Sequence, residues 1–224
     1  MACALKQGGG LYQRLRIGAV LLAAGEGKRM GGVAKPLIRL QGVPLIARHL
    51  VAMSACGVDE VVVVTGHARE AVEEQVRRFI VTLAHNDAYA DGQDGSVRVG
   101  LAALQGQFDA VFVALADQPL IGGGDLTELI GAFKKRSGGH IVVPMVDGVR
   151  GNPILLDAVA QARILAGEAN TGCRRLIDRE PALVHAHQTS NTRFVTDLDT
   201  VEDVEALAKN TGWKLEFPAA QAVR

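Results

Sequence analysis

Residues 17–37 read IGAVLLAAGEGKRMGGVAKPL, and two features of this stretch are informative. The first seven residues are apolar or small, which is typical of a strand buried on both faces. Four glycines follow between residues 25 and 32, and Pro36 stops a helix from running through that region. The stretch therefore predicts a buried strand that leads into a glycine-rich loop.

The rest of the chain continues this pattern, because short β-branched runs alternate with helix-like segments at the spacing of βαβ units. We expect strands at residues 17–23, 60–65, 80–84, 110–115, 141–144, 154–156 and 183–187. We expect helices at residues 44–56, 68–79, 96–104, 125–136, 157–165, 171–178 and 200–209. The turn at residues 146–149 predicts an antiparallel hairpin between the strands expected at 141–144 and 154–156. The sequence thus indicates an α/β fold with a Rossmann-like, mostly parallel sheet, helices on both faces and a small antiparallel β-hairpin element.

The length of 224 residues favours one sizeable domain over two. We place it at residues 16–210, with a loosely ordered N-terminal extension at residues 1–15 and a C-terminal tail at residues 211–224. Lys and Arg number 24, as do Asp and Glu, so the formal net charge is zero. No broad basic surface for nucleic acid is expected, and any anion site must be local.

Cysteine usage and hydropathy bear on the compartment. Cys3, Cys56 and Cys173 lie too far apart for a CxxC metal motif, and their odd number argues against a disulfide framework. We therefore expect a reducing, cytoplasmic setting. The apolar run at residues 17–24 is far shorter than the roughly 18 residues of a transmembrane helix, so no membrane partner is expected.

The glycine-rich loop departs from two common phosphate-binding motifs. A dinucleotide fingerprint GxGxxG that begins at Gly25 requires a small residue where the chain has Met30. A Walker loop requires Gly where the chain has Leu22, and Ser or Thr where it has Arg29. The loop therefore belongs to neither class.

What remains is a loop whose backbone N–H groups can approach phosphate oxygens, together with two cations, Arg29 and Lys35. We interpret it as a triphosphate-binding loop. The alternative is a surface loop whose cations are only solvated, which is the role we expect for Lys28.

Asp117 directly follows the strand expected at residues 110–115, at the carboxyl end where open α/β sheets bind ligands. Mg²⁺ is usually held by one or two carboxylates together with phosphates and water, so Asp117 is a candidate metal ligand. The alternative is a turn-forming aspartate before Pro119.

The sequence LLAAGEGKRMGGVAKPL (residues 21–37) resembles the signature of the MobA/MocA-like nucleotidyltransferases, in which LAAG or LAGG precedes xxxRMG and then a lysine. The resemblance continues to about residue 205. It includes HND at 85–87 with GQDGSVRVGL at 92–101, ADQP at 116–119, RGNP at 150–153 and DLDTVED at 197–203. It implies a nucleotide-diphospho-sugar transferase-like fold and the attachment of a nucleoside monophosphate to the phosphate of molybdopterin.

The resemblance also implies the residues of the site. Together with the loop, it implies that Arg29, Lys35 and Asp117 are catalytic and that Asp117 and Asp197 hold Mg²⁺. Asn152 and Arg174 are expected to bind the acceptor, and the expected nucleotide-binding residues are Leu22, Ala23, Ala24, Gly25, Gly27, Arg29, Lys35, Asn86, Gly95 and Ser96.

The acidic residues near position 200 have competing interpretations. Asp197 follows strand-like residues 194–196, and the resemblance implies that it supplies a second metal contact; the alternative is a helix cap. Asp199 and Asp203 flank Thr200 in a capping-box arrangement, and we assign both carboxylates to helix capping.

Ser96 also has two interpretations. It could cap the helix expected at residues 96–104, or its hydroxyl could contact the nucleotide. Relatives often carry two serines in this turn, whereas Gly95 precedes a single serine here.

The expected activity is Mg²⁺-dependent transfer of a nucleoside monophosphate to molybdopterin, with release of pyrophosphate. LAAG at residues 22–25 resembles the cytidylyl branch, so CTP is the expected nucleotide, and a recipient molybdoenzyme is a further expected partner. Guanylyl transfer, a sugar-1-phosphate nucleotidyltransferase and a non-catalytic cofactor carrier remain open. A nicotinamide-binding oxidoreductase is least expected, because the dinucleotide fingerprint fails at Met30.

Overall fold

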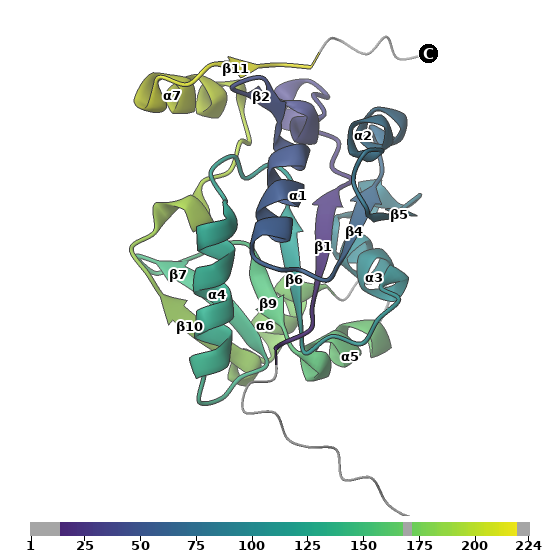
Figure 1. Cartoon of the computed structure of the whole chain (residues 1–224), viewed down its shortest axis with the longest axis vertical. Helices are drawn as coiled ribbons and strands as arrows, with labels where there is room; N and C mark the ends of the chain where they lie inside the picture. The colour runs from purple at the N-terminus through teal and green to yellow at the C-terminus, as the bar shows by residue number, and fades with distance from the viewer. Residues whose placement is uncertain (1–13, 168–171, 219–224) are drawn as a thin grey trace, which may run out of the picture.

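The computed structural model describes residues 14–167 and 172–218. Cys3, most of the expected N-terminal extension and the last six residues of the expected tail therefore lie outside the described residues. The described part is built around a central sheet, with a small second sheet at one end (Figure 1).

The central sheet has eight strands, and β1 (Ile17–Ala23) lies in its interior. β1 pairs in parallel with β4 (Glu60–Thr65) on one side and with β6 (Ala110–Leu115) on the other. The order is β10-β7-β9-β6-β1-β4-β5, with β8 on β7; the other strands are β5 (Thr82–His85), β7 (Ile141–Val146), β8 (Val149–Arg150), β9 (Ile154–Leu156) and β10 (Val184–Gln188). β9 runs antiparallel to β6 and β7. The expected Rossmann-like, mostly parallel sheet is confirmed.

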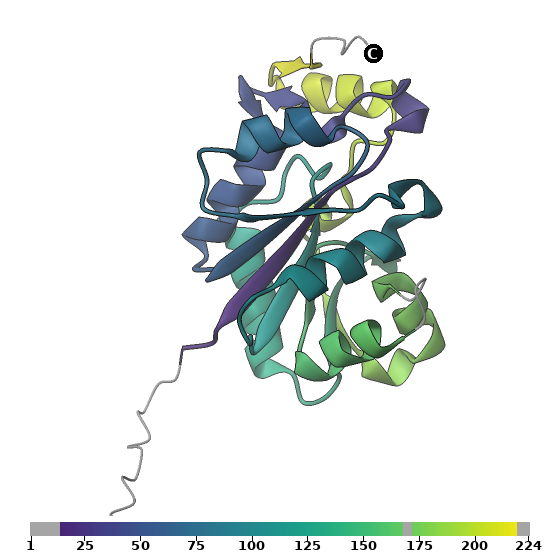
Figure 2. The ribbon, with the colours of Figure 1, turned by 90° about the vertical axis from the view of Figure 1, so that its right-hand side faces the viewer.

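Helices cover both faces of this sheet (Figure 2). One face carries α1 (Leu45–Ala55), α2 (Arg69–Val76) and α4 (Gly123–Lys135), and the other carries α3 (Gln93–Ala103), α5 (Ala158–Ala166) and α6 (Cys173–Arg179). Alternate residues of β1 supply the two cores: Leu21 packs with α1, α2 and α4, whereas Val20 and Leu22 pack with α3, α5 and α6. Burial on both faces explains why β1 is apolar along its whole length.

A third apolar cluster lies under the small antiparallel sheet and α7 (Val201–Thr211). The sheet has the order β11-β2-β3, with β2 at Arg39–Leu40, β3 at Val43–Pro44 and β11 at Leu215–Glu216. The cluster contains Met30, Ile38, Leu40, Leu45, Leu198, Val204 and Leu207. Met30 is 4% exposed, so this loop residue is a core residue. Strands of two residues carry no readable alternation, which is why the sequence did not predict this sheet.

The expected turn at residues 146–149 is confirmed, but the strand that follows it is β8, which the sequence did not predict and which pairs antiparallel with β7 around Asp147 and Gly148. β9, the strand expected to complete the hairpin, also pairs antiparallel with β7. Both turn residues have positive φ, 48° and 82°, which is the conformation of a type I′ turn.

Several expected boundaries differ from the structure by one to three residues, and two of the differences concern residues expected at the site. The helix expected to begin at Ser96 begins at Gln93, with Gly92 at the N-cap, so the capping role expected for Ser96 is wrong. The strand-like residues 194–196 belong instead to a 3-10 helix, Thr192–Val195, and the residue that follows it. Among the described helices, none is both long and apolar enough to cross a membrane.

Candidate active site

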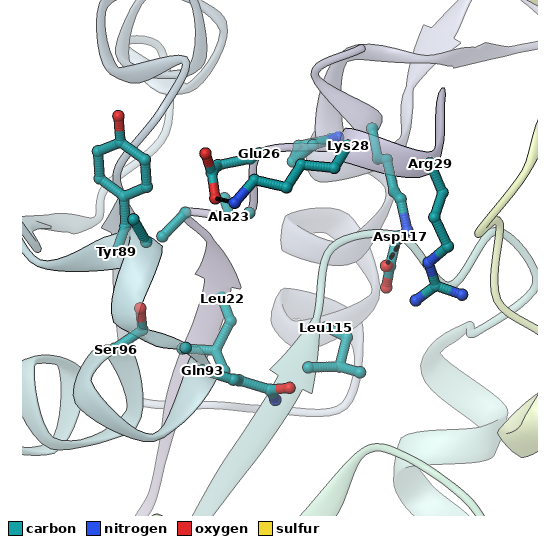
Figure 3. A pocket seen from close by; sticks show the side chains of 17 residues that line it. Leu22, Ala23, Glu26, Lys28, Arg29, Tyr89, Gln93, Ser96, Leu115 and Asp117 are labelled. Carbon is teal, nitrogen blue, oxygen red and sulfur yellow. Dashed lines mark hydrogen bonds and ion pairs between the residues drawn. The ribbon is translucent and has the colours of Figure 1, made fainter. Parts of the chain in front are cut away.

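The candidate site is an open cleft of about 350 Å³ above the carboxyl ends of β1 and β6 (Figure 3). The chain leaves β1 toward β4 and β5 and returns to β6 on the opposite side, which makes this edge a topological switch point, where open α/β sheets bind ligands. The cleft is lined by the end of β1 and the loop after it (residues 22–29, Lys35 and Pro36), by Leu115 at the end of β6 and Asp117 beyond it, and by Tyr89, Ala90, Gly92, Gln93 and Ser96 before and within α3.

The glycine-rich loop is folded tightly back on itself. Gly27 has φ +59°, and a Cβ at this position would lie 2.1 Å from the carbonyl oxygen of Val33. The carbonyl of Gly27 accepts hydrogen bonds from the N–H groups of Met30 (2.8 Å) and Gly32 (3.0 Å). Because Met30 is anchored in the core, the neighbouring Arg29 is held at the rim of the cleft, where its side chain is 69% exposed.

Lys35 is the centre of a charge cluster. Its Nζ lies 2.6 Å from Oδ1 of Asp199 and 3.2 Å from Oδ2 of Asp117. Arg29 joins the cluster through a 2.7 Å contact between its Nη1 and Oδ2 of Asp199. Burial by itself would lower the pKa of the Lys35 ammonium, but the charges and hydrogen bonds of Asp117 and Asp199 outweigh it and raise this pKa. Lys35 is therefore a permanent cation at neutral pH.

The two carboxylates that contact Lys35 titrate in opposite directions. Burial raises the pKa of Asp117, and the ammonium of Lys35 opposes this rise without cancelling it. Burial also acts against ionisation of Asp199, but the hydrogen bond and charge of Lys35, followed by those of Arg29, lower the pKa of Asp199 overall. Asp199 is thus the more firmly ionised partner.

The assignment of Asp199 to helix capping is wrong. Asp203 alone makes the capping box with Thr200: its Oδ2 accepts from the N–H of Thr200 at 2.7 Å, and the Thr200 hydroxyl accepts from the N–H of Asp203 at 3.2 Å. The same Oδ2 accepts from the N–H of Asp199 at 3.0 Å, which leaves the Asp199 side chain free to face Lys35. The spacing Asp197-Leu198-Asp199 places two carboxylates in one loop and could have indicated a role at the site. The capping-box pattern around Thr200 favoured a different interpretation of the same residues.

The segment that carries Asp197 and Asp199 is fixed to the rest of the site by hydrogen bonds. The N–H of Leu198 donates to the carbonyl of Asp117 at 3.0 Å. The carbonyl of Phe194 accepts from Nε2 of the buried Gln118 at 3.0 Å and from the N–H of Asn152 at 2.8 Å. These contacts set the position of the segment relative to the end of β6.

The chemistry of the cluster suits a hard divalent cation. Oδ1 of Asp117 is buried and has no hydrogen-bond partner among the described protein atoms, so an acceptor is left over beside the cleft. Asp197 is an exposed residue close to this cluster. The loss of some solvent around its carboxyl raises its pKa, and the negative charges of Asp199 and Asp117 raise it further. Asp197 is not among the described residues that line the cleft. Over the described residues, no three His, Cys, Asp or Glu side chains come together as a ready-made metal site.

The expected nucleotide residues divide into two groups. Leu22, Ala23, Ala24, Gly25, Gly27, Arg29, Lys35 and Ser96 line the cleft, whereas Asn86 and Gly95 are not among its described lining residues. Nδ2 of the buried Asn86 donates to the hydroxyl of Ser96 at 2.9 Å, and its Oδ1 accepts from the N–H of Ala88 at 3.1 Å. Asn86 therefore orients Ser96 from behind the cleft wall.

A second cavity, of about 770 Å³, adjoins the first, and Gly92 and Gln93 line both. It contains the two residues expected to bind the acceptor, Asn152 and Arg174. Arg175 also lines it, with its Nε 3.3 Å from a carboxylate oxygen of Asp94.

Arg150, in the RGNP segment, and Cys173 also line the second cavity. Arg150 forms an ion pair with Asp178, and burial raises the pKa of the Cys173 thiol to about 12, which makes it a structural group rather than a nucleophile.

Comparison with protein families matches residues 19–187 to the MobA-like NTP transferase domain. The nicotine blue oxidoreductase of Paenarthrobacter nicotinovorans is 30% identical over 195 residues, which cover 84% of this chain and 94% of that protein. The bifunctional protein GlmU of Pelobacter propionicus is 35% identical over 128 residues, which cover 57% of this chain. The match spans 28% of the length of that GlmU protein.

Solved structures share the fold. An Rv0371c homologue from Mycobacterium sp. strain JC1 superposes with a TM-score of 0.74 at 25% identity, over 88% of this chain and 98% of that one. A nucleotidyl transferase from Methanothermobacter thermautotroptrophicus gives a TM-score of 0.70 at 24% identity, over 87% and 97%. Rv0371c of Mycobacterium tuberculosis H37Rv, solved in complex with manganese, gives 0.68 at 20% identity, over 88% and 100%.

Proposed function

The chain belongs to the MobA-like NTP transferase family, and we propose that it transfers a nucleoside monophosphate, CMP in preference, from a nucleoside triphosphate to the phosphate of molybdopterin. The observation that carries the proposal is Lys35, held between Asp117 and Asp199 beside a cleft of the size that ligands usually occupy. The adjoining cavity, with Asn152 and Arg174, supplies the place for the acceptor.

In the proposed reaction, an oxygen of the acceptor phosphate forms a bond to the α-phosphorus of the triphosphate. The bond between this phosphorus and the oxygen that bridges to the β-phosphate breaks, and pyrophosphate leaves with the bonding electrons. The nucleophile is already anionic, so no protein base is required. Lys35 and Arg29 neutralise charge on the phosphates, and the backbone of the Gly25–Gly27 turn holds them in line.

Asp117 and Asp197 would hold a divalent cation, which we propose to be Mg²⁺, and the cation would add positive charge at the phosphates. Oδ1 of Asp117, for which the described part of the chain supplies no hydrogen-bond partner, fits this role. CTP is proposed because LAAG at residues 22–25 resembles the cytidylyl branch, and Ala24 of this segment lines the cleft.

The test is an assay with CTP labelled at the α-phosphate, Mg²⁺ and molybdopterin, in which label should appear in the acceptor as pyrophosphate is released. GTP in place of CTP, and a sugar 1-phosphate in place of molybdopterin, test the guanylyl and sugar alternatives. Label that reaches neither acceptor with any nucleotide would contradict the proposal and favour the carrier alternative.

A second candidate function is the oxidation or reduction of nicotine blue, because the chain is similar to nicotine blue oxidoreductase over 94% of that protein. It is tested by following the visible absorbance of nicotine blue with the protein and a nicotinamide cofactor. Turnover there, with no nucleotidyl transfer, would replace the proposed function.

A further inference from the structure

Tyr89 stands at the end of the cleft away from the charge cluster. It begins a 3-10 helix, Tyr89–Asp91, and its half-buried side chain lines the cleft. Figure 3 shows the ring at one end and Arg29 and Asp117 at the other, with the Glu26–Lys28 pair on the rim between them. The cleft therefore has a charged end and an aromatic end.

This polarity sets the direction of a bound nucleotide. A triphosphate held by Arg29 and Lys35 must extend its nucleoside toward the opposite end, where Leu22, Ala24 and the ring of Tyr89 supply apolar surface. Every nucleobase has a π-face, so an aromatic side chain at that end offers a stacking surface to any of them.

The ring is held in place before any ligand arrives. Gly66 allows its close approach, because a Cβ on Gly66 would lie 2.8 Å from Cβ of Tyr89. His67 packs edge-on against the ring, with centroids 6.0 Å apart and planes at 61°. A side chain that is already ordered loses little conformational entropy on binding, so more of the stacking energy appears as affinity.

We propose that Tyr89 binds the nucleobase of the triphosphate by stacking, and that it contributes affinity without discriminating between bases. The inference rests on the proposed nucleotide site and names one of its residues. Discrimination between bases then falls to other lining residues, such as Ala24, Gln93 and Ser96.

The test is calorimetric titration, with Mg²⁺ present, of CTP, GTP and tripolyphosphate into the wild type, Tyr89→Phe and Tyr89→Leu. Loss of a base stack costs roughly 1–3 kcal/mol, so Tyr89→Leu should raise Kd for CTP and GTP alike by about 5-fold to 150-fold. Tyr89→Phe should stay within about threefold of the wild type, since it keeps the ring. Tripolyphosphate has no base, so its Kd should be the same in all three proteins.

Leu83→Ala, on the exposed side of the nearby β5, is the matched control and should leave all three Kd values unchanged. If Tyr89→Leu weakens tripolyphosphate as much as CTP, the ring shapes the cleft and the stacking proposal is overturned. If Tyr89→Leu binds CTP as the wild type does, the proposal fails while the proposed function stands. If the wild type binds tripolyphosphate but neither nucleotide, the stacking proposal and the proposed function are both overturned.

Discussion

Nζ of Lys35 lies 2.6 Å from Oδ1 of Asp199, although 164 positions separate the two residues in the chain. The contact exists because Leu198, beside Asp199, is fully buried in the same cluster as Met30 and Ile38 of the loop segment. Packing of the small sheet and α7 therefore completes a charge cluster whose other acid, Asp117, comes from the central sheet.

Replacement of Lys35 should remove most of the activity and leave the fold intact. Lys35→Met keeps the length of the side chain and removes the charge that neutralises the phosphates. We expect kcat for nucleotidyl transfer to fall by about 10²-fold to 10³-fold, the range for loss of one charge-stabilising donor. Lys134→Ala, exposed in the last turn of α4, is the matched control and should keep wild-type kcat. Equal kcat in Lys35→Met and wild type would remove Lys35 from the mechanism.

Asp199 and Asp203 should separate catalysis from helix capping. Asp199→Asn removes the carboxylate charge that faces Lys35 and Arg29, so we expect a lower kcat. Asp203→Ala removes the capping box of α7, which costs about 1 kcal/mol, or roughly 2–4 °C in Tm for a chain of this size, with kcat retained. Kinetics and thermal unfolding of both variants check this, and the reverse pattern would restore Asp199 to a capping role.

The raised pKa of Asp117 predicts a pH-dependent stability with a definite sign. The pKa of Asp117 in the folded state lies above the ordinary value of 3.8, so the folded state binds the proton more tightly than the unfolded state does. The free energy of unfolding therefore falls as pH rises from 3.8 through the folded pKa of Asp117. Asp117→Asn cannot ionise, so its Tm relative to wild type should increase from acid to neutral pH. A Tm difference that is constant with pH would contradict the assignment.

Asp199 supplies the opposite control for this experiment. Its folded pKa is lowered, so its ionised form adds stability above the ordinary pKa of an aspartate, and that stability is lost as pH falls through the lowered value. The Tm of Asp199→Asn relative to wild type should therefore decrease from acid to neutral pH, a trend opposite in sign to that of Asp117→Asn.

Asn86 and Ser96 should be energetically coupled. Their side chains share a buried 2.9 Å hydrogen bond, and removal of either partner leaves the other unsatisfied. In a double-mutant cycle with Asn86→Ala and Ser96→Ala, the unfolding free energies should depart from additivity by about 0.5–1.5 kcal/mol. Chemical denaturation of the four proteins measures the coupling, and additive losses would show that the bond contributes nothing.

Most strands of the central sheet could be predicted from the sequence alone, as could three charged residues that line the cleft. The bounds expected for β1, β4, β6 and β9 agree with the structure, because a strand buried on both faces is apolar along its length and needs no distant information to be recognised. Arg29 and Lys35 could be singled out because they lie in the loop after β1, and Asp117 because it follows β6; the structure brings all three to one cleft.

Two features depend on how distant segments pack: which acidic residues face Lys35, and which of the expected nucleotide-binding residues line the cleft. A capping box and a charge cluster use the same residue types, so local pattern could not tell the role of Asp199 from that of Asp203. Asn86 and Ser96 are both buried, but of the two Ser96 lines the cleft, and this difference depends on how β5, α3 and the loop pack together. Lys35 and Asp199 are 164 positions apart and meet through packing of the folded chain. Their contact could not be predicted from the spacing of residues along the sequence.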